Sequence, residues 1–290
     1  MPNIQNSPLF ILGNNRSGTS LLRLILTCHD NVIIPPESHF LLWLHDKYKN
    51  WEYTIGFEAF LKDLYAATKF ETWQIPENEL KNHLILSKPQ NYPELIASIY
   101  LFYGKMLKKH VKIWGDKNSL WVEKLNTIKK LYPNAKYIHI IRDGRDVATS
   151  YLQLANKNSS NKYYPNLPHE IDQIAKVWSK NVSELTQFFA QIQNETFLEV
   201  KYENLILDHK NEIEKILNFL KLPLSEKVFS YYKINAEKNF EPKEFMNWKQ
   251  KLNQPPDKSN INKYRQVLSP EEITLFNSIA KKELQRYEYI

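Results

Sequence analysis

Residues 9–20 read LFILGNNRSGTS, and this stretch decides the fold of the chain. The apolar run at 9–12 stops at Gly13, which is typical of a buried strand. After the turn at 13–18, apolar residues recur with helical spacing at Leu21, Leu22, Ile25 and Leu26. The stretch therefore predicts a strand–loop–helix unit. The amides of such a glycine-bearing loop and the N-terminus of its helix can hold an anionic phosphate.

The same arrangement recurs twice further along the chain. Residues 136–141 read as a strand, and the helix predicted after them runs from Val147 to Leu154. Residues 196–201 read as another strand, followed by a helix through 212–220. Strands that alternate with helices indicate a parallel sheet with crossover helices. We therefore expect an α/β, P-loop-like three-layer fold with a central parallel sheet flanked by helices and ligands at the strand ends.

Two helical insertions and two long loops separate these units. The insertions are expected at about 40–109 and 167–193, and the polar loops at 156–168 and 235–262. Loops of that length in a compact domain are usually functional lids or disordered segments. Because the chain contains no internal repeat and no low-complexity linker, we expect a single domain over residues 1–290.

The composition is that of a basic globular protein. With 39 Lys and Arg against 32 Asp and Glu, the formal net charge is +7. Such a balance reflects either a solvated basic surface or a partner that carries several phosphates. The single cysteine, Cys28, excludes an internal disulfide framework and gives no sign of a metal site. Since it lies in an apolar helical run, we predict that Cys28 is a buried structural thiol.

The chain shows no pattern of membrane insertion or secretion. No stretch approaches the ~18 uninterrupted apolar residues that a membrane span needs. Residues 1–8 are polar and lack the charged start and apolar run of a signal peptide. We therefore expect a cytoplasmic protein without a membrane span.

The glycine-bearing loop at 13–20 differs from the phosphate loop of nucleoside triphosphatases. Thr19 stands where a Walker loop carries the lysine that reaches the β- and γ-phosphates. This substitution argues against an ATPase or a kinase. Arg16 instead brings a positive charge inside the loop, which suits a donor with one 5′-phosphate.

Residues 15–20, NRSGTS, resemble the 5′-phosphosulfate-binding loop of sulfotransferases that use 3′-phosphoadenosine 5′-phosphosulfate (PAPS). The segments HDNV at 29–32 and PES at 36–38 extend the resemblance to protein-tyrosine sulfotransferases and similar bacterial enzymes. The resemblance implies that this chain moves a sulfuryl group from PAPS to an acceptor hydroxyl. It assigns donor binding to Asn15, Arg16, Ser17, Gly18, Thr19 and Ser20.

The chemistry of that reaction requires a base and cations. An attacking hydroxyl must lose its proton, and the family pattern favours Glu37 as the base over its rival His39. Charge on the leaving phosphate needs fixed cations. Lys117 is a candidate because it precedes Arg142 by 25 residues, the same separation as in the tyrosine sulfotransferases. Arg16 would act beside it, and we expect no metal.

The remaining donor contacts follow from the same resemblance. Residues 142–150, RDGRDVATS, resemble the family's 3′-phosphate motif, with Arg142 and Ser150 as the matched residues. Gly144 stands where many sulfotransferases have proline and the tyrosine-type enzymes have glycine. Tyr202 matches a tyrosine that commonly lies at the nucleotide. A looser match in a segment that often closes over the cofactor adds Lys258, Ser259 and Arg265.

Three alternatives compete with this interpretation: a P-loop kinase-like enzyme, a non-enzymatic nucleic-acid-binding protein and an inactive relative. We expect no nucleic-acid partner, because the basic motif residues lie at strand ends rather than in a stripe. The acceptor is a peptide tyrosine, a glycan, a lipid or a small molecule, contacted by segments 40–110 and 153–195. Nothing in the sequence indicates the oligomeric state.

Overall fold

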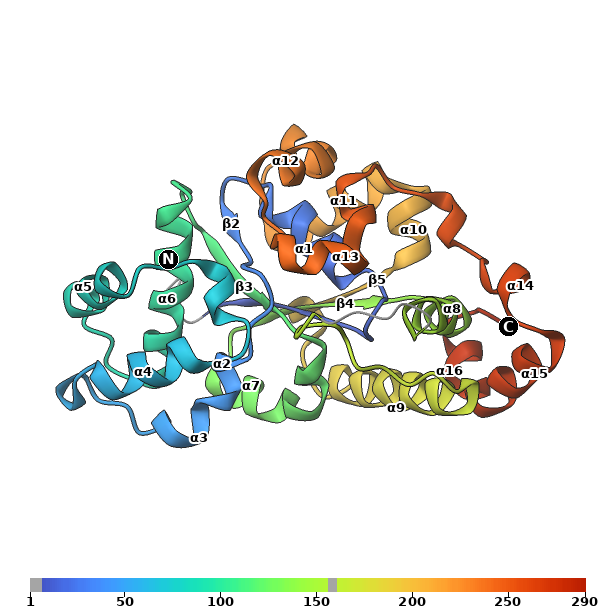
Figure 1. Cartoon of the computed structure of the whole chain (residues 1–290), viewed down its shortest axis with the longest axis horizontal. Helices are drawn as coiled ribbons and strands as arrows, with labels where there is room; N and C mark the ends of the chain where they lie inside the picture. The colour runs from blue at the N-terminus through green and yellow to red at the C-terminus, as the bar shows by residue number, and fades with distance from the viewer. Residues whose placement is uncertain (1–6, 156–160) are drawn as a thin grey trace.

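The computed structural model of the chain describes residues 7–155 and 161–290. Across these residues five strands form one sheet in the order β2-β3-β1-β4-β5, and every pairing is parallel (Figure 1). The strands are β1 (Leu9–Leu12), β2 (Val32–Ile33), β3 (Ile113–Lys117), β4 (Lys136–Ile141) and β5 (Phe197–Lys201). The predicted α/β fold with a central parallel sheet is thus confirmed.

Strand β1 lies at the centre of the sheet because its side chains are apolar on both faces. All four of its residues are fully buried. Phe10 and Leu12 pack into one hydrophobic core, and Leu9 and Ile11 pack into a second core on the opposite face. A continuous apolar run of this kind is typical of a strand covered on both sides. Strand β1 therefore joins the two cores.

Helices cover both faces of the sheet. Figure 1 shows α1 and α10–α13 on one side, and α7, α9, α15 and α16 on the other. The helices are α1 (Thr19–Thr27), α2 (Phe40–Trp43), α3 (His45–Tyr48), α4 (Glu58–Ala66), α5 (Glu77–Ser87), α6 (Tyr92–Met106), α7 (Leu125–Leu131), α8 (Gly144–Ala155), α9 (Ile171–Phe189), α10 (Tyr202–Leu207), α11 (His209–Leu220), α12 (Tyr231–Lys238), α13 (Met246–Lys249), α14 (Tyr264–Val267), α15 (Pro270–Ile279) and α16 (Lys281–Arg286). This arrangement confirms the three predicted layers.

The expected insertions are helical. Helices α2–α6 occupy the first insertion, and α9 occupies most of the second. Aromatic rings tie the first insertion to the sheet: Trp73 lies 5.1 Å from Tyr100, and Tyr100 lies 4.6 Å from Trp114 of β3, measured between ring centroids. A large share of the aromatic content therefore packs the core. Cys28 is buried at the end of α1, as predicted.

Several predicted boundaries were wrong. Helix α8 begins at Gly144, three residues before the predicted start, because an Asp143 carboxylate oxygen accepts a hydrogen bond from the Arg145 amide in its first turn. Helix α11 likewise begins at His209. Strands β2 and β3 were not predicted, because β2 has only two residues and β3 ends in polar ones.

The segment predicted as a loop at 235–262 is instead built of short helical turns. It contains the end of α12, helix α13 and the 3₁₀ turns Lys243–Phe245, Gln250–Asn253 and Lys258–Asn260. Of the other predicted loop, 156–168, residues 156–160 lie outside the described part of the chain. No helix in the described residues is long and apolar enough to cross a bilayer.

Replacing Gly144 with alanine should destabilise the protein. A Cβ at this position would lie 2.5 Å from a ring carbon of Trp178 and 2.6 Å from one of Phe276. Overpacking of this kind costs about 1–3 kcal/mol, more than the helix propensity that alanine gains. We expect urea unfolding to show a loss of about 1–2 kcal/mol. Leu86→Ala is the control: its side chain is 82% exposed, and its replacement should change stability by less than about 0.5 kcal/mol. A Gly144→Ala variant as stable as the wild type would contradict the tight packing of α8.

Candidate active site

The loop between β1 and α1 has a constrained backbone. Gly18 is the N-cap of α1 with a φ of 98°, and a Cβ there would lie 2.6 Å from the ring of Tyr202. Arg16 also has a positive φ, 66°, which is uncommon for a residue with a side chain. Its guanidinium is held across the molecule: Nε donates to Ser150 Oγ at 3.0 Å, and Nη2 donates to the Trp248 carbonyl at 3.2 Å.

Arg142 meets this loop from the end of the neighbouring strand. It directly follows β4, and its Nη1 donates to the carbonyl oxygen of Arg16 at 3.0 Å. Its Nη2 donates to the Asn260 carbonyl at 2.7 Å, and its guanidinium lies 4.6 Å from the centre of the Tyr202 ring. One guanidinium therefore joins the phosphate loop, the second strand end and the C-terminal segment.

A cavity of about 550 Å³ opens at this junction. Its volume is within the range of sites for small molecules and cofactors. Of the residues predicted to bind the donor, those lining the cavity are Arg16, Gly18, Thr19, Ser20, Arg142, Ser150 and Tyr202. The sequence motifs at 15–20, 142–150 and 200–205 thus meet at one place.

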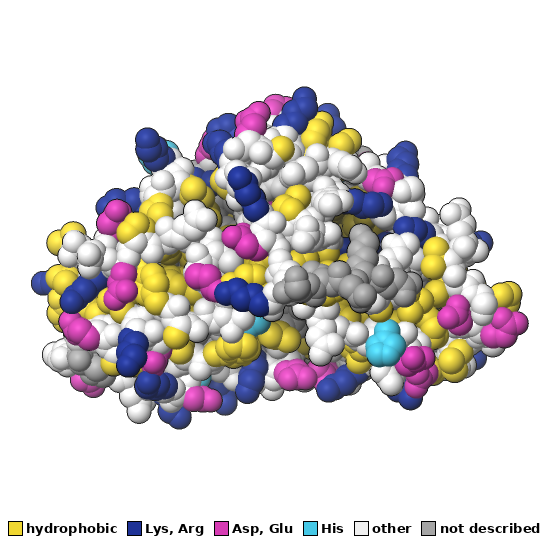
Figure 2. Space-filling view, viewed as in Figure 1, with side chains coloured by type: hydrophobic (Ala, Val, Ile, Leu, Met, Phe, Trp, Pro, Cys, Tyr) yellow, Lys and Arg dark blue, Asp and Glu magenta, His cyan; other side chains and the backbone are white. Residues whose placement is uncertain are grey.

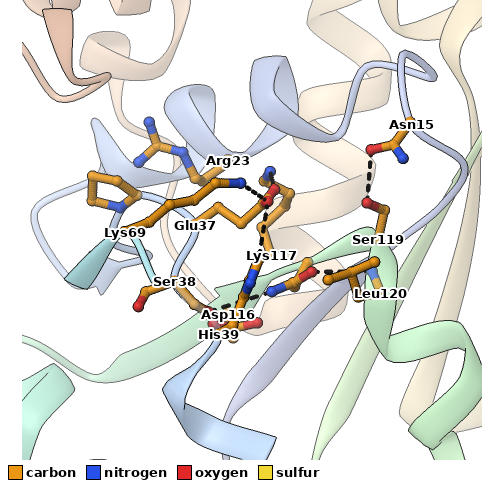
Figure 3. Close-up of polar contacts among 12 residues, drawn as sticks. Asn15, Arg23, Glu37, Ser38, His39, Lys69, Asp116, Lys117, Ser119 and Leu120 are labelled. Carbon is orange, nitrogen blue, oxygen red and sulfur yellow. Dashed lines mark hydrogen bonds and ion pairs between the residues drawn. The ribbon is translucent and has the colours of Figure 1, made fainter. Parts of the chain in front are cut away.

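Two predicted loop residues point elsewhere. The Asn15 side-chain oxygen accepts a hydrogen bond from Ser119 Oγ at 2.7 Å, which ties the loop to the segment after β3 (Figure 3). Ser17 is 1% exposed, and its hydroxyl has no hydrogen-bond partner among the described residues. Neither residue lines the cavity.

The C-terminal segment contributes residues other than those predicted. Lys258 and Ser259 are exposed and do not line the cavity, because Asp257 caps this 3₁₀ turn and accepts hydrogen bonds from the Ser259 amide and hydroxyl. Arg265 is exposed as well, beside the ring of Tyr264. The residues of this region that do line the cavity include Lys249, Lys251, Asn260 and Lys263. Lys249 and Lys251 lie outside every recognised motif, whereas Asn260 and Lys263 lie within the loosely matched segment 258–265, from which other residues were predicted.

The wall formed by Arg16 and Arg142 carries concentrated positive charge. Burial and the neighbouring Arg142 guanidinium lower the pKa of Arg16 to about 10. The Nε of Arg142 is buried and has no acceptor among the described residues. Two adjacent guanidinium groups with a free donor favour an anionic ligand at this wall.

A second cluster surrounds Glu37 (Figure 3). The Lys117 ammonium lies 2.5 Å from Glu37 Oε2, and the Lys69 ammonium lies 2.5 Å from Oε1. His39 Nε2 is 3.4 Å from the same Oε1, so the two candidate bases are in contact. Burial raises the pKa of the Glu37 carboxyl, but Lys117, His39 and Lys69 outweigh it and hold the pKa well below its ordinary value. The carboxylate is therefore ionised at neutral pH.

The end of β3 fixes the position of Lys117. Its neighbour Asp116 is fully enclosed and accepts hydrogen bonds from Tyr100 Oη at 2.6 Å and Trp121 Nε1 at 2.5 Å. Burial raises the pKa of Asp116 to about 6. The Asn118 amide then donates to the Ser38 carbonyl at 3.3 Å, which joins β3 to the segment that carries Glu37.

Sequence reasoning missed Lys69, which neutralises Glu37. It precedes the 3₁₀ turn Phe70–Trp73 in the helical insertion and belongs to no motif. Glu37 and Lys117 do not line the cavity themselves. Among the described residues, no three His, Cys, Asp or Glu side chains gather as a set of metal ligands.

Solved structures share this fold. The sulfotransferase domain of the Synechococcus PCC 7002 olefin synthase superimposes with a TM-score of 0.62 at 20% identity, covering 95% of this chain and 94% of that one. The sulfotransferase domain from the curacin biosynthetic pathway gives 0.60 at 19% identity, covering 94% and 96%. Mouse sulfotransferase SULT7A1 complexed with PAP gives 0.54 at 14% identity, covering 98% and 86%.

Curated relatives are similar in sequence. An inferred protein-tyrosine sulfotransferase of Caenorhabditis briggsae is 27% identical over 248 residues, which cover 82% of this chain and 74% of that protein. Protein-tyrosine sulfotransferase A of Caenorhabditis elegans is 24% identical over 223 residues, covering 77% of this chain. The alignment spans about half of that protein, 52% of its length.

The alternatives gain no support from the structure. On the face shown in Figure 2, basic and acidic side chains are interspersed and form no basic stripe of the kind that a nucleic-acid-binding surface would present. Thr19 lines the cavity where a kinase-like enzyme would need its lysine. The model of the sulfotransferase family matches residues 8–226, which include both phosphate motifs and Glu37. The chain belongs to the sulfotransferase family.

Proposed function

We propose that this chain transfers a sulfuryl group from PAPS to an acceptor hydroxyl. The observation that carries the proposal is the convergence of Arg16, Arg142 and Ser150 on one cavity wall. Two strand ends far apart in sequence thereby present cations to a single ligand. The family and the mouse structure complexed with PAP support PAPS as the donor.

The chain's own groups suit the two phosphates of such a donor. Arg142, whose Nε is free, and Ser150 would hold the 3′-phosphate. The loop at 15–20, of which Arg16, Gly18, Thr19 and Ser20 line the cavity, and the N-terminus of α1 would hold the 5′-phosphate. Tyr202, Tyr231 and Leu252 add apolar surface to the cavity for the adenosine.

The reaction would be an in-line displacement at sulfur. The acceptor oxygen forms a bond to sulfur while the bond from sulfur to the bridging phosphate oxygen breaks. The acceptor proton passes to the Glu37 carboxylate, and the leaving product is 3′-phosphoadenosine 5′-phosphate (PAP). Lys117 and Arg16 stabilise the charge that develops on the leaving phosphate.

The ion pair between Glu37 and Lys117 would couple donor binding to the strength of the base. While Lys117 and Lys69 both neutralise Glu37, the carboxylate is ionised but a weak base. A donor phosphate competes for the Lys117 ammonium. As Lys117 turns toward it, Glu37 loses one cation and its pKa rises, so the base strengthens only when the donor is present.

We further propose that the chain acts as one sulfotransferase domain and that its acceptor is a hydroxyl compound such as a protein tyrosine. The names of the curated relatives support a tyrosyl acceptor. Segments 40–110 and 153–195 would contact it. The ring of Trp43 lies 4.4 Å from that of His39, which contacts Glu37. The side chains of Lys162 and Tyr163 contact Glu71, two residues after the Lys69 that pairs with Glu37.

The direct test is incubation with radiolabelled PAPS and a panel of tyrosine peptides, glycans, lipids and small alcohols. We expect label to move to at least one hydroxyl acceptor and PAP to be released in equal amount. ATP tested in parallel should bind more weakly than PAP. If no acceptor gains label and PAP does not bind in calorimetry, the proposal is wrong.

Arg142→Ala should weaken the binding of PAP about 10- to 100-fold, because hydrogen bonds to charged groups contribute about 1.5–3 kcal/mol. Isothermal titration calorimetry measures this directly. Arg265→Ala is the matched control, because it removes an exposed arginine outside the cavity and should leave PAP affinity unchanged. If Arg142→Ala bound PAP with normal affinity, the 3′-phosphate site would have to lie elsewhere.

Glu37→Gln should lower kcat about 10²- to 10⁴-fold, the usual contribution of a general base, while PAP affinity changes much less. The variant His39→Asn tests the other candidate base, His39. We expect it to lower kcat far less than Glu37→Gln, because His39 is the neighbour of the carboxylate in this scheme. If His39→Asn lost more activity than Glu37→Gln, the base would be His39.

A further inference from the structure

Lys249 lies at the junction between the cavity and the Glu37 cluster. It is the last residue of α13 and lines the cavity, but its side chain is only 13% exposed. Its ammonium lies 2.5 Å from Glu241 Oε1. Burying a lysine ammonium costs free energy unless it is paired with an anion. The position of Lys249 therefore differs from that of an ordinary surface lysine.

A chain of buried ion pairs anchors Lys249 to the phosphate loop. The other oxygen of Glu241 lies 2.5 Å from Nη2 of Arg23, and both of these side chains are 2% exposed or less. Arg23 belongs to α1, the helix that follows the loop, and its Nη1 donates to the Ile34 carbonyl at 2.9 Å, three residues before Glu37. The residue before Lys249 is Trp248, and its carbonyl oxygen accepts a hydrogen bond from Arg16. Lys249 is therefore fixed relative to the loop and to the base.

This arrangement leaves positive charge unbalanced. Arg23 and Lys249 are two cations that share the single carboxylate of Glu241, and Lys69 and Lys117 are two cations that share Glu37. Each trio has a net charge of +1, but the ionised Asp116 carboxylate beside Lys117 offsets that of the Glu37 trio. Lys249 and Lys117 are close enough for each trio to act on the other, since Lys117 lowers and Glu37 raises the pKa of Lys249. An anion at this junction would therefore meet the surplus positive charge of the Glu241 trio.

We propose that Lys249 is a further catalytic cation, which donates to the sulfuryl oxygens of the donor during transfer, and that Glu241 and Arg23 are its positioning residues. The inference rests on the proposed function and adds a residue to it. Arg16 and Arg142 would hold the nucleotide phosphates, whereas Lys249 lines the cavity, is held there by Glu241, and interacts electrostatically with Lys117 and Glu37, where sulfur and acceptor would meet. A fixed donor aimed at oxygens that gain charge in the transition state typically contributes 10²- to 10³-fold to kcat.

The first test separates transfer from nucleotide binding. We expect Lys249→Met to lower kcat with PAPS about 10²- to 10³-fold and to leave the Kd of PAP within about threefold, because PAP lacks the sulfuryl group. Lys243→Met is the matched control: it removes an exposed lysine from the preceding turn and should leave kcat unchanged. If Lys249→Met turns over like the wild type, or weakens PAP as much as it lowers kcat/KM, the proposal is wrong.

The second test uses pH. Burial lowers the pKa of Lys249 to about 8, and the neighbouring Lys117 acts in the same direction. Glu241 and Glu37 raise this pKa, but their effects are outweighed. A lowered lysine pKa means that the ammonium loses its proton as pH rises, so kcat/KM for PAPS should fall through about pH 8. Lys249→Arg should retain activity and lose this alkaline limb, because a guanidinium stays charged. An unchanged limb in Lys249→Arg would overturn the assignment.

The third test addresses positioning. Glu241→Gln removes the carboxylate that raises the pKa of Lys249, so the alkaline limb should move to lower pH while kcat falls. A residue with a merely structural role would lower activity without moving the limb. Thermal unfolding of every variant distinguishes loss of folding from loss of transfer. A wild type that transfers no sulfuryl group would refute the proposed function itself, whereas an active wild type with an active Lys249→Met refutes only this inference.

Discussion

The structure depends on the interactions of the Arg142 guanidinium. Its two terminal nitrogens donate to carbonyl oxygens of the phosphate loop and of the C-terminal segment, 126 and 118 residues away in sequence. A guanidinium has five donors in a rigid plane, so it can hold two backbone segments and still have a donor left for a ligand. Through these hydrogen bonds Arg142 joins the loop after β1 to the C-terminal segment at the cavity that it lines.

Charge is the second constraint on the site. Burial opposes ionisation, yet the interior near the strand ends contains Glu37, Glu241, Arg23, Lys69 and Lys117, all with an oppositely charged partner. Removing one member of such a set leaves an uncompensated buried charge, which is strongly destabilising. The alternation of signs allows several cations to lie near one another before an anionic ligand arrives. It also makes each pKa depend on the neighbouring charges, so the binding of an anion would change the pKa of Glu37.

The sequence predicted the parts of this molecule that follow from local rules. Strands β1 and β4 have the predicted bounds, since both are apolar runs that end at a glycine or at charged residues. The loop at 13–18 was predicted from its glycine spacing after a strand, and Arg142 from the resemblance of its motif to that of sulfotransferases, and the parallel sheet brings both to one edge. Strand β3 was missed because Asp116 and Lys117 are buried by partners distant in sequence, Tyr100 and Glu37.

Side-chain direction in the irregular segments could not be predicted. Lys258 and Ser259 were predicted from the loose resemblance of their segment to bacterial sulfotransferases, but Asp257 caps that turn and accepts the hydrogen bonds of Ser259. Lys69 and Lys249 do not lie at a characteristic distance from any sequence motif. Only tertiary packing brings Lys69 to Glu37 and Lys249 to Glu241. Long-range ion pairs leave no local pattern in a sequence, because either partner alone resembles an ordinary surface charge.

The C-terminal segment also has a consequence for biosynthesis. Asp146 accepts hydrogen bonds from the amides of Asn262 and Tyr264, which holds the segment at 247–263 against α8, and residues of this segment complete the cavity wall. A chain emerging from the ribosome folds from its N-terminal side first. The sheet can therefore assemble before the nucleotide cavity is enclosed. Until residues 247–263 leave the exit tunnel, a nascent chain would have the loop at 13–18 in place but lack the far wall of the cavity.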